Sequence, residues 1–332
     1  MAILQLTEKD VNILQDLANC RLLTLKQIKR LYYSNVKWGH YKRIEKMRQN
    51  GLVVTRPLMG KRGKEGVCVY LTKKGFKAIN LPHLEPTIKH IPSHMQNFRV
   101  AISEIYTQLK DSSWEWTDSR EIKAELPIYR GSVMAAVLTQ PTGECYFLYM
   151  TTPSPKEESI GTLLKDISLN LGTQSHIRNV IIFCHNRNDI RQLEVPLEGA
   201  SKMLLLQYPD DIGLLKKLTD PDVIVNHPDL EMDDRFFTRD HQPFANMRIE
   251  LKLPRGTMEA YLTELMTNDQ MKIHHLKRYS KDDAIRNNMR GVCVLVKKED
   301  EYYYRNEVFD PITYEHIRII PVDKQWRESN GC

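Results

Sequence analysis

The chain has 332 residues, of which 41% are apolar and 27% charged, a length that suggests about two domains with hydrophobic cores of their own. Its 15 glycines and 16 prolines exclude a collagen-like or disordered chain. No apolar run approaches the roughly 18 residues that span a membrane. The first residues lack the layout of a secretory signal, and the six cysteines are scattered singly. The composition therefore predicts a cytoplasmic protein without a disulfide framework or a zinc ribbon.

The formal net charge of +6 is unevenly distributed along the chain. Residues 1–80 contain 17 Lys and Arg against 5 Asp and Glu, a net charge of +12. The remaining residues contain 31 basic and 37 acidic side chains, a net charge of −6. A basic N-terminal region is typical of nucleic-acid binding, because neutralising phosphates releases counterions. The alternative is a solvated, lysine-rich surface without a partner.

Three short helices are predicted within the first fifty residues. Thr7 and Asp10 match a capping box that precedes an apolar helical stripe. Thr24 and Gln27 can cap a second helix in the same way. A third helix is predicted from about residue 37 to residue 49, and its core-facing side is expected to include Tyr41.

A β-hairpin is predicted after the third helix. Two β-rich runs at 52–55 and 67–71 flank a loop over 56–66 that carries three glycines and four basic residues. Three short helices followed by a basic-tipped hairpin is the order of a winged helix-turn-helix domain. Residues 1–80 are therefore predicted to form a winged helix that binds double-stranded DNA, with protein contacts as the alternative use of the same fold.

The residues expected to contact DNA come from the third helix and the hairpin. The outward side of the helix is predicted to enter the major groove and to carry Lys37, Trp38, His40, Lys42, Arg43 and Lys46. The hairpin tip is predicted to enter the minor groove or to grip phosphates through Arg56, Lys61, Arg62 and Lys64.

A linker over residues 81–92 is predicted to lead into an α/β region over residues 93–210. Its expected order is helix, three strands, helix, strand, at 94–109, 114–122, 133–139, 145–151, 157–171 and 180–184. This is the core order of restriction-endonuclease-like nucleases. Those enzymes hold Mg²⁺ through an Asp near the second strand and an acid-x-Lys pair on the third.

That set of catalytic residues is missing from the expected strands. The second strand begins with residues 129–133 and contains no carboxylate, and residues 146–152 of the third contain neither an acid nor a lysine. We therefore expect no catalytic residues, no metal and no cofactor here, and no enzymatic activity. A sheet flanked by helices could still serve as a scaffold or a dimerisation surface.

Residues 211–332 are predicted to be a C-terminal extension of the α/β body. Seven acidic residues lie between 220 and 240, and we interpret them as a solvated loop, because the alternating pattern of a calcium loop is absent. A short helix is predicted at 259–266. Residues 292–296 and 302–309 are predicted to form a hairpin.

Taken together, the order of these elements resembles the bacterial replication-relaxation proteins of plasmids and other mobile elements. Besides the winged helix, the resemblance rests on Ile91-Pro92-Ser93-His94, Trp114-Glu115-Trp116, the strand pair after it and Val180–Cys184. It implies an α+β fold in which an N-terminal winged helix-turn-helix precedes an α/β domain resembling a degenerate restriction-endonuclease-like fold. Many members carry Pro-Asp at the second strand and an acidic pair on the third. This sequence departs at Gly131-Ser132 and at Met150-Thr151-Thr152.

Three functions fit the sequence. The first is sequence-specific DNA binding in replication initiation or in relaxation and transfer of a mobile element, with replication or relaxase proteins as partners. The second is transcriptional regulation by the same N-terminal domain. The third is a metal-dependent nuclease or nicking enzyme whose acids come from an unrecognised place, such as residues 220–240. We expect a homodimer and no membrane association, since winged helices that bind two half-sites commonly do so as symmetric dimers.

Overall fold

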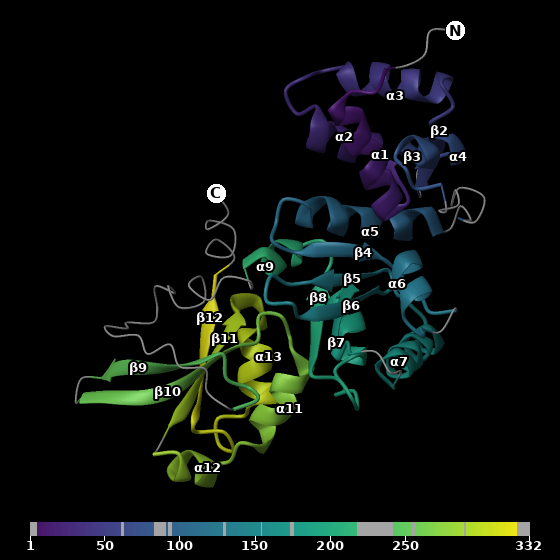
Figure 1. The fold of residues 1–332 in the computed structure, drawn as a ribbon. Coiled ribbons are helices and arrows are strands. Elements are labelled where there is room, and N and C mark those ends of the chain that lie inside the picture. The colour runs from purple at the N-terminus through teal and green to yellow at the C-terminus, as the bar shows by residue number, and fades with distance from the viewer. Residues whose placement is uncertain are drawn as a thin grey trace. The chain divides into compact units, whose positions relative to one another are not determined.

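The computed structural model describes residues 5–60, 63–82, 91, 95–128, 131–153, 155–172, 176–217, 242–253, 256–288 and 290–323. This part of the chain is α+β and contains three β-sheets (Figure 1). The chain divides into unit 1, Met1–Ile122, and unit 2, Lys123–Cys332. The helix expected after the linker falls within unit 1, whereas most of the linker expected at 81–92 lies outside the described residues.

Three helices open unit 1: α1 (Glu8–Cys20), α2 (Leu25–Tyr32) and α3 (Gly39–Gln49). Both predicted capping boxes are confirmed. The Thr7 hydroxyl accepts a hydrogen bond from the Asp10 amide at 3.3 Å, and the Asp10 carboxylate accepts one from the Thr7 amide at 2.8 Å. Thr24 and Gln27 make the equivalent pair at 3.2 and 2.8 Å. The starts of α1 and α2 are thus encoded within four residues of sequence.

A small antiparallel sheet follows, in the order β1-β3-β2. Its strands are β1 (Leu23–Thr24), β2 (Val53–Gly60) and β3 (Gly63–Leu71). Pairing of β2 with β3 continues outward to Gly60 opposite Gly63. The loop predicted over 56–66 is therefore wrong for most of its length, because the chain stays paired almost to the turn. Helix α4 (Lys73–Ala78) comes next.

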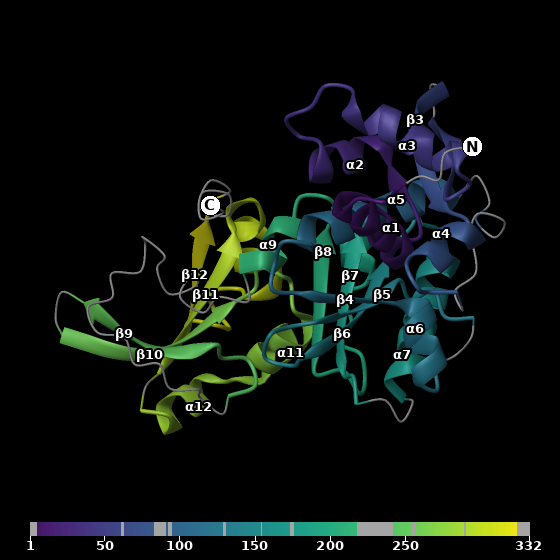
Figure 2. The ribbon, with the colours of Figure 1, turned by 45° about the horizontal axis from the view of Figure 1, so that its top comes forward.

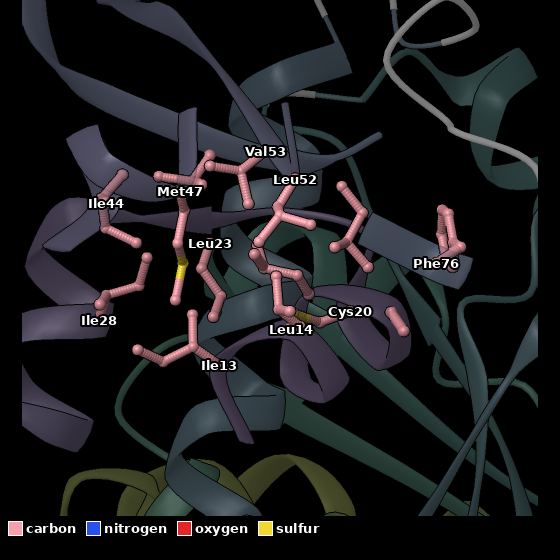
Figure 3. Packing of buried hydrophobic residues seen from close by; sticks show 14 of the residues in the cluster. Ile13, Leu14, Cys20, Leu23, Ile28, Ile44, Met47, Leu52, Val53 and Phe76 are labelled. Atoms are coloured by element: carbon pink, nitrogen blue, oxygen red, sulfur yellow. The ribbon is translucent and has the colours of Figure 1, made fainter. Parts of the chain in front are cut away.

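Figure 3 shows the core that the helices and the sheet of unit 1 share. Burying each Leu, Ile or Val side chain of such a core contributes about 1.5–3 kcal/mol. The core side chains that Figure 3 labels are Ile13, Leu14, Cys20, Leu23, Ile28, Ile44, Met47, Leu52, Val53 and Phe76. This core fixes the rotation of α3 about its own axis.

Unit 1 also contains α5 (Gln96–Leu109) and β4 (Glu115–Asp118). Tyr106 of α5 joins the same core, and its hydroxyl donates a hydrogen bond to the Asp16 carboxylate at 2.7 Å. The strand predicted over 114–122 is wrong in its second half, since helix α6 (Ser119–Glu125) begins there. The Asp118 carboxylate accepts the Arg120 amide at 2.8 Å, which favours this helix start over a continued strand.

The first sheet of unit 2 contains β5 (Ala136–Thr139), β6 (Cys145–Met150), β7 (Asn179–Cys184) and β8 (Lys202–Gln207), side by side in that order. Strands β5 and β6 are antiparallel, whereas β6, β7 and β8 run parallel. The helices between and after them are α7 (Glu157–Gly172), α8 (Arg187–Gln192) and α9 (Ile212–Lys217). The prediction that residues 180–184 form a buried parallel strand is confirmed.

The second sheet of unit 2 contains β9 (Met247–Leu253), β10 (Gly256–Glu264), β11 (Gly291–Lys297) and β12 (Ile317–Val322). Its helices are α11 (Gln270–Arg278), α12 (Lys281–Arg286) and α13 (Glu301–Tyr303), the last continued by a π-helical turn, Tyr304–Val308. Two predictions are wrong here: residues 259–264 are strand, not helix, and residues 302–308 are helical, not strand. Strand β11 pairs in parallel with β10 and β12, and parallel neighbours need a crossover between them.

Strands β5 to β8 and the four strands of the second sheet share one pattern, an antiparallel pair followed by two parallel additions. The segment after β10 lies along β8, where the Leu205 amide donates to the Thr267 carbonyl at 3.0 Å and the Met203 amide to the Asp269 carboxylate at 3.1 Å. In Figure 2 the β9–β10 hairpin extends beyond the end of β11, as its register requires. Among the described residues, no helix is long and apolar enough to cross a membrane.

Candidate nucleic-acid interface

The orientation of α3 is set by the three residues that face the core of unit 1. His40, Ile44 and Met47 follow at helical spacing, and they are 3%, 3% and 0% exposed. The prediction that His40 lies on the outward side is wrong. Its ring packs 4.1 Å from the ring of Tyr41 and 6.2 Å from that of Tyr33. The inner face is thus shifted by one residue from the prediction, which had placed Tyr41 inside.

The opposite side of α3 carries aromatic and cationic side chains together. Trp38 is 58% exposed and Tyr41 48% exposed, and their rings lie 5.8 Å apart. Lys42 and Lys46 are exposed on the same stripe, and neither ammonium group makes a hydrogen bond or an ion pair with any residue that the structure describes. Lys37, just before the helix, is exposed as well. We call Trp38, Tyr41, Lys42 and Lys46 the α3 face.

Arg43 has a different role from the lysines on either side of it. Its Nε donates to the Asp10 carboxylate at 2.7 Å, and one terminal nitrogen, Nη2, donates both to the other oxygen of Asp10 and to the Gln5 carbonyl. Burial opposes ionisation of Asp10, but hydrogen bonds from Arg43 and Thr7 outweigh it and lower the pKa of that carboxyl. Arg43 was predicted to face outward; instead it fastens α3 to the start of α1.

The β2–β3 hairpin offers fewer described cations than predicted. Arg56 and Lys64 are exposed, as expected, and neither has an ion-pair partner within the described ranges. Lys61 and Arg62 lie outside the described residues. Glu65 is also exposed near the tip, so a carboxylate accompanies these cations.

This geometry suits contact with a polyanion that also presents flat apolar surfaces. Lysine ammonium groups bind phosphates or guanine edges, and aromatic rings pack on sugars, bases or thymine methyl groups. Tyr41 was missed as a candidate contact because an aromatic residue in an apolar stripe usually faces the core. A sequence signal for its exposure did exist, since His40, Ile44 and Met47 form an alternative i, i+4, i+7 series.

A second group of polar residues lies in unit 2 beside β5 and β6, the strands on which a nuclease of this order carries its acids. The Ser132 hydroxyl, ahead of β5, donates to Asp166 at 2.8 Å, and the Thr151 hydroxyl, after β6, donates to Asp189 at 3.3 Å. Both carboxylates are buried and come from helices, so inspection of the strands alone missed them. No three His, Cys, Asp or Glu side chains in the described ranges gather to hold a metal ion. The acidic segment 220–240 lies outside those ranges.

Comparisons with known proteins add little to this geometry. No family model matches the chain, and no curated protein sequence matches it. Among solved structures, it shows a weak likeness to that of the SdaI restriction endonuclease, with a TM-score of 0.22 and 11% identity over 60% of this chain and 87% of that one. A likeness at this level carries no argument about fold or function. The chain is an α+β protein with several sheets.

Proposed function

We propose that unit 1 is a winged helix-turn-helix that binds duplex DNA, with α3 in the major groove and the β2–β3 hairpin against the neighbouring backbone. The order of three helices and an antiparallel hairpin supports this proposal. The observation that carries it is the α3 face, on which two exposed aromatic rings lie beside two lysines without a described partner.

A solvated lysine surface is the simplest competing explanation, and it accounts for only half of the α3 face. Lysines are at home in water, but Trp38 and Tyr41 expose large apolar rings next to each other. Exposed apolar side chains that gather in one place mark interaction sites. The net charge of +12 over residues 1–80, from 17 basic and 5 acidic residues, favours a nucleic acid over a protein as the partner.

We further propose that binding is sequence-specific and serves replication initiation or transfer of a plasmid or mobile element. This role rests on the resemblance of the sequence to replication-relaxation proteins. In this proposal unit 2, as a degenerate nuclease-like body without catalytic activity, joins two copies of the chain and thereby sets the spacing of two half-sites. Regulation of transcription would use the same face of α3, and mapping of bound sites in the host separates one origin from many promoters.

Replacing the two lysines of the α3 face tests the DNA-binding surface. Affinity for a fluorescent duplex is measured by anisotropy over a series of salt concentrations. Lys42→Ala with Lys46→Ala is expected to weaken binding by at least tenfold at moderate salt. If both lysines contact phosphates, the slope of log K against log salt becomes shallower by about 2, since each lost contact removes roughly 0.9 from it.

The matched control replaces two lysines on another helix of unit 1. Lys73 and Lys77 of α4 are exposed and make no described ion pair, so Lys73→Ala with Lys77→Ala removes the same charge elsewhere. Equal losses in the two double variants would mean that only net charge matters and would contradict the α3 face. Selection from a random duplex pool tests specificity: an enriched inverted repeat supports both specificity and a dimer, and an unenriched pool contradicts the specific-binding proposal.

A further inference from the structure

Two arginines donate hydrogen bonds to a single carboxylate at the end of α1 that is remote from the Arg43 contact, and the charge of a third, Arg99, interacts with theirs. Arg21 ends α1, and its Nε and a terminal nitrogen donate to the two oxygens of Asp118, both at 3.0 Å. Arg120, in the first turn of α6, donates to Asp118 from its Nε at 2.8 Å. At 1.5 Å per residue, α1 rises by about 16 Å from Asp10, which binds Arg43, to Arg21. We call Arg21, Arg99 and Arg120 the arginine cluster.

Arg99 belongs to α5, and its charge interacts with those of Arg21, Asp118 and Arg120. Ser103, one helical turn further along the same side of α5, donates its hydroxyl to the Leu22 carbonyl at 2.7 Å. That bond holds this side of α5 against the chain segment next to Arg21. Within the described ranges, the Arg99 guanidinium makes neither a hydrogen bond nor an ion pair, although it lies over the Phe98 ring at 5.7 Å.

None of the described hydrogen bonds that Asp118 accepts comes from Arg99. Its Oδ1 accepts hydrogen bonds from Arg21 Nη2, Arg120 Nε and the Arg120 amide, and its Oδ2 accepts one from Arg21 Nε. Arg120 NH1 is buried without a described partner. Burial and the neighbouring charge of Arg21, followed by that of Arg120, lower the pKa of Arg99 to about 9, and Asp118 opposes them only in part.

The charges of the cluster do not cancel. Three guanidinium groups and one carboxylate leave two positive charges among side chains that are only partly exposed, 13% for Arg21 and 21% for Arg120, and an uncompensated charge that is partly desolvated is costly. An anion with two negative charges and several acceptor oxygens would restore neutrality and accept from donors on different sides. The Ser119 hydroxyl already accepts from Arg21 at 2.6 Å, so its own proton can be donated to such an anion.

We propose that the arginine cluster is a binding site for a doubly charged phosphate group, either free phosphate or the phosphate of a small nucleotide. Arg99 and Arg120 Nη1 provide donors that have no described hydrogen-bond partner, and Arg21 is hydrogen-bonded to both Asp118 and Ser119. A duplex bound on the α3 face would meet the other end of α1. The site is therefore independent of the proposed DNA-binding function.

Thermal unfolding of the full chain in phosphate and in chloride, at matched pH and ionic strength, tests the site. Phosphate is expected to raise the Tm of the wild type in a saturable way, by about 2–4 °C. Arg99→Met removes a guanidinium group that has no carboxylate partner. The Tm of this variant in chloride is therefore expected to equal or exceed that of the wild type, and phosphate is expected not to change it. Arg278→Met, at an exposed arginine of α11, is the control that keeps the wild-type response.

Two further measurements keep the proposal open to contradiction if Arg99→Met folds poorly. Calorimetric titration of the wild type with phosphate is expected to give about one site per chain, and the conservative Arg99→Lys variant is expected to bind more weakly but detectably. If adenosine monophosphate binds more tightly than phosphate, the site is assigned to a nucleotide. If phosphate binds more tightly, the site is assigned to the free ion. If phosphate does not change the Tm of the wild type, or changes the Tm of Arg99→Met equally, the proposal is overturned. The affinity of Arg99→Met for duplex DNA is expected to equal that of the wild type.

Discussion

Neighbouring basic residues of α3 have opposite environments. Lys42 and Lys46 project from the α3 face without a described partner, whereas Arg43, between them, is held by a buried carboxylate of α1. All three contribute equally to the net charge of the N-terminal region. The difference teaches that the number of basic residues predicts a nucleic-acid partner only in general terms. The rotation of α3 about its axis decides which of its cations can contact such a partner.

Among the variants that distinguish Arg43 from the two exposed lysines of α3, Arg43→Met is expected to have the largest effect, a loss of stability. Asp10 is 1% exposed, and loss of its partner leaves a buried charge without compensation. The free energy of unfolding should fall by about 2–4 kcal/mol, measured by denaturant titration. DNA affinity of the remaining folded protein should be close to that of the wild type, because Arg43 is not on the α3 face.

Arg48→Met is the matched control on the same helix. Arg48 pairs with Glu45 at the surface, so this variant should change stability only slightly. Should Arg43→Met prove as stable as Arg48→Met and bind DNA more weakly, Arg43 would be a DNA contact after all and the distinction would fail.

A smaller effect, on binding and not on stability, is expected from Trp38→Ala. The ring is 58% exposed, so its removal leaves the core of unit 1 unchanged. Loss of its contact with bases or sugars should weaken duplex binding by about tenfold, roughly 1.4 kcal/mol, in an anisotropy titration. Tyr302→Ala removes an aromatic side chain that is 75% exposed in unit 2 and should leave affinity unchanged. Equal affinities for Trp38→Ala and the wild type would restrict the α3 face to its lysines.

The smallest expected effect concerns pH and the inner side of α3. Burial, with a lesser contribution from Lys29, lowers the pKa of His40 below its ordinary value of 6.5. Below that value the unfolded chain binds a proton that the folded chain excludes, so stability falls as the pH falls from about 6.5 toward the folded pKa. His40→Phe should flatten this part of the stability curve, measured by denaturant unfolding at several pH values. An unchanged slope would show that His40 is not the titrating group.

Local signals were readable from the sequence, and signals that depend on distant partners were not. The capping boxes at Thr7 and Thr24 lie within four residues, and both helices begin where predicted. The phase of α3 was misjudged by one residue because a histidine was counted as polar and Tyr41 as apolar. Only the packing of α3 against α1 and the sheet decides between the two series.

The errors in unit 2 have a different physical origin. Residues 259–264 form a strand whose side chains are buried on both faces of the second sheet from Ala260 onward. A short apolar run of this kind does not distinguish a buried strand from a helix. The same limit applies to the arginine cluster. Arg21 and Asp118 are 97 residues apart in the chain, so no local pattern joins them.

The pairing of the segment after β10 with β8 also affects how copies of this chain can meet. A free strand edge is a template for strands of other molecules and hence for aggregation. Residues 267–269 occupy the edge of β8, while the edge strand β12 carries Pro321, which has no N–H to donate, and the exposed Arg318. At these two edges, a second copy that adds a strand to either sheet gains few backbone hydrogen bonds. Contact between copies there must use side-chain surfaces, and detachment of residues 267–269 would expose the edge of β8 to aggregation.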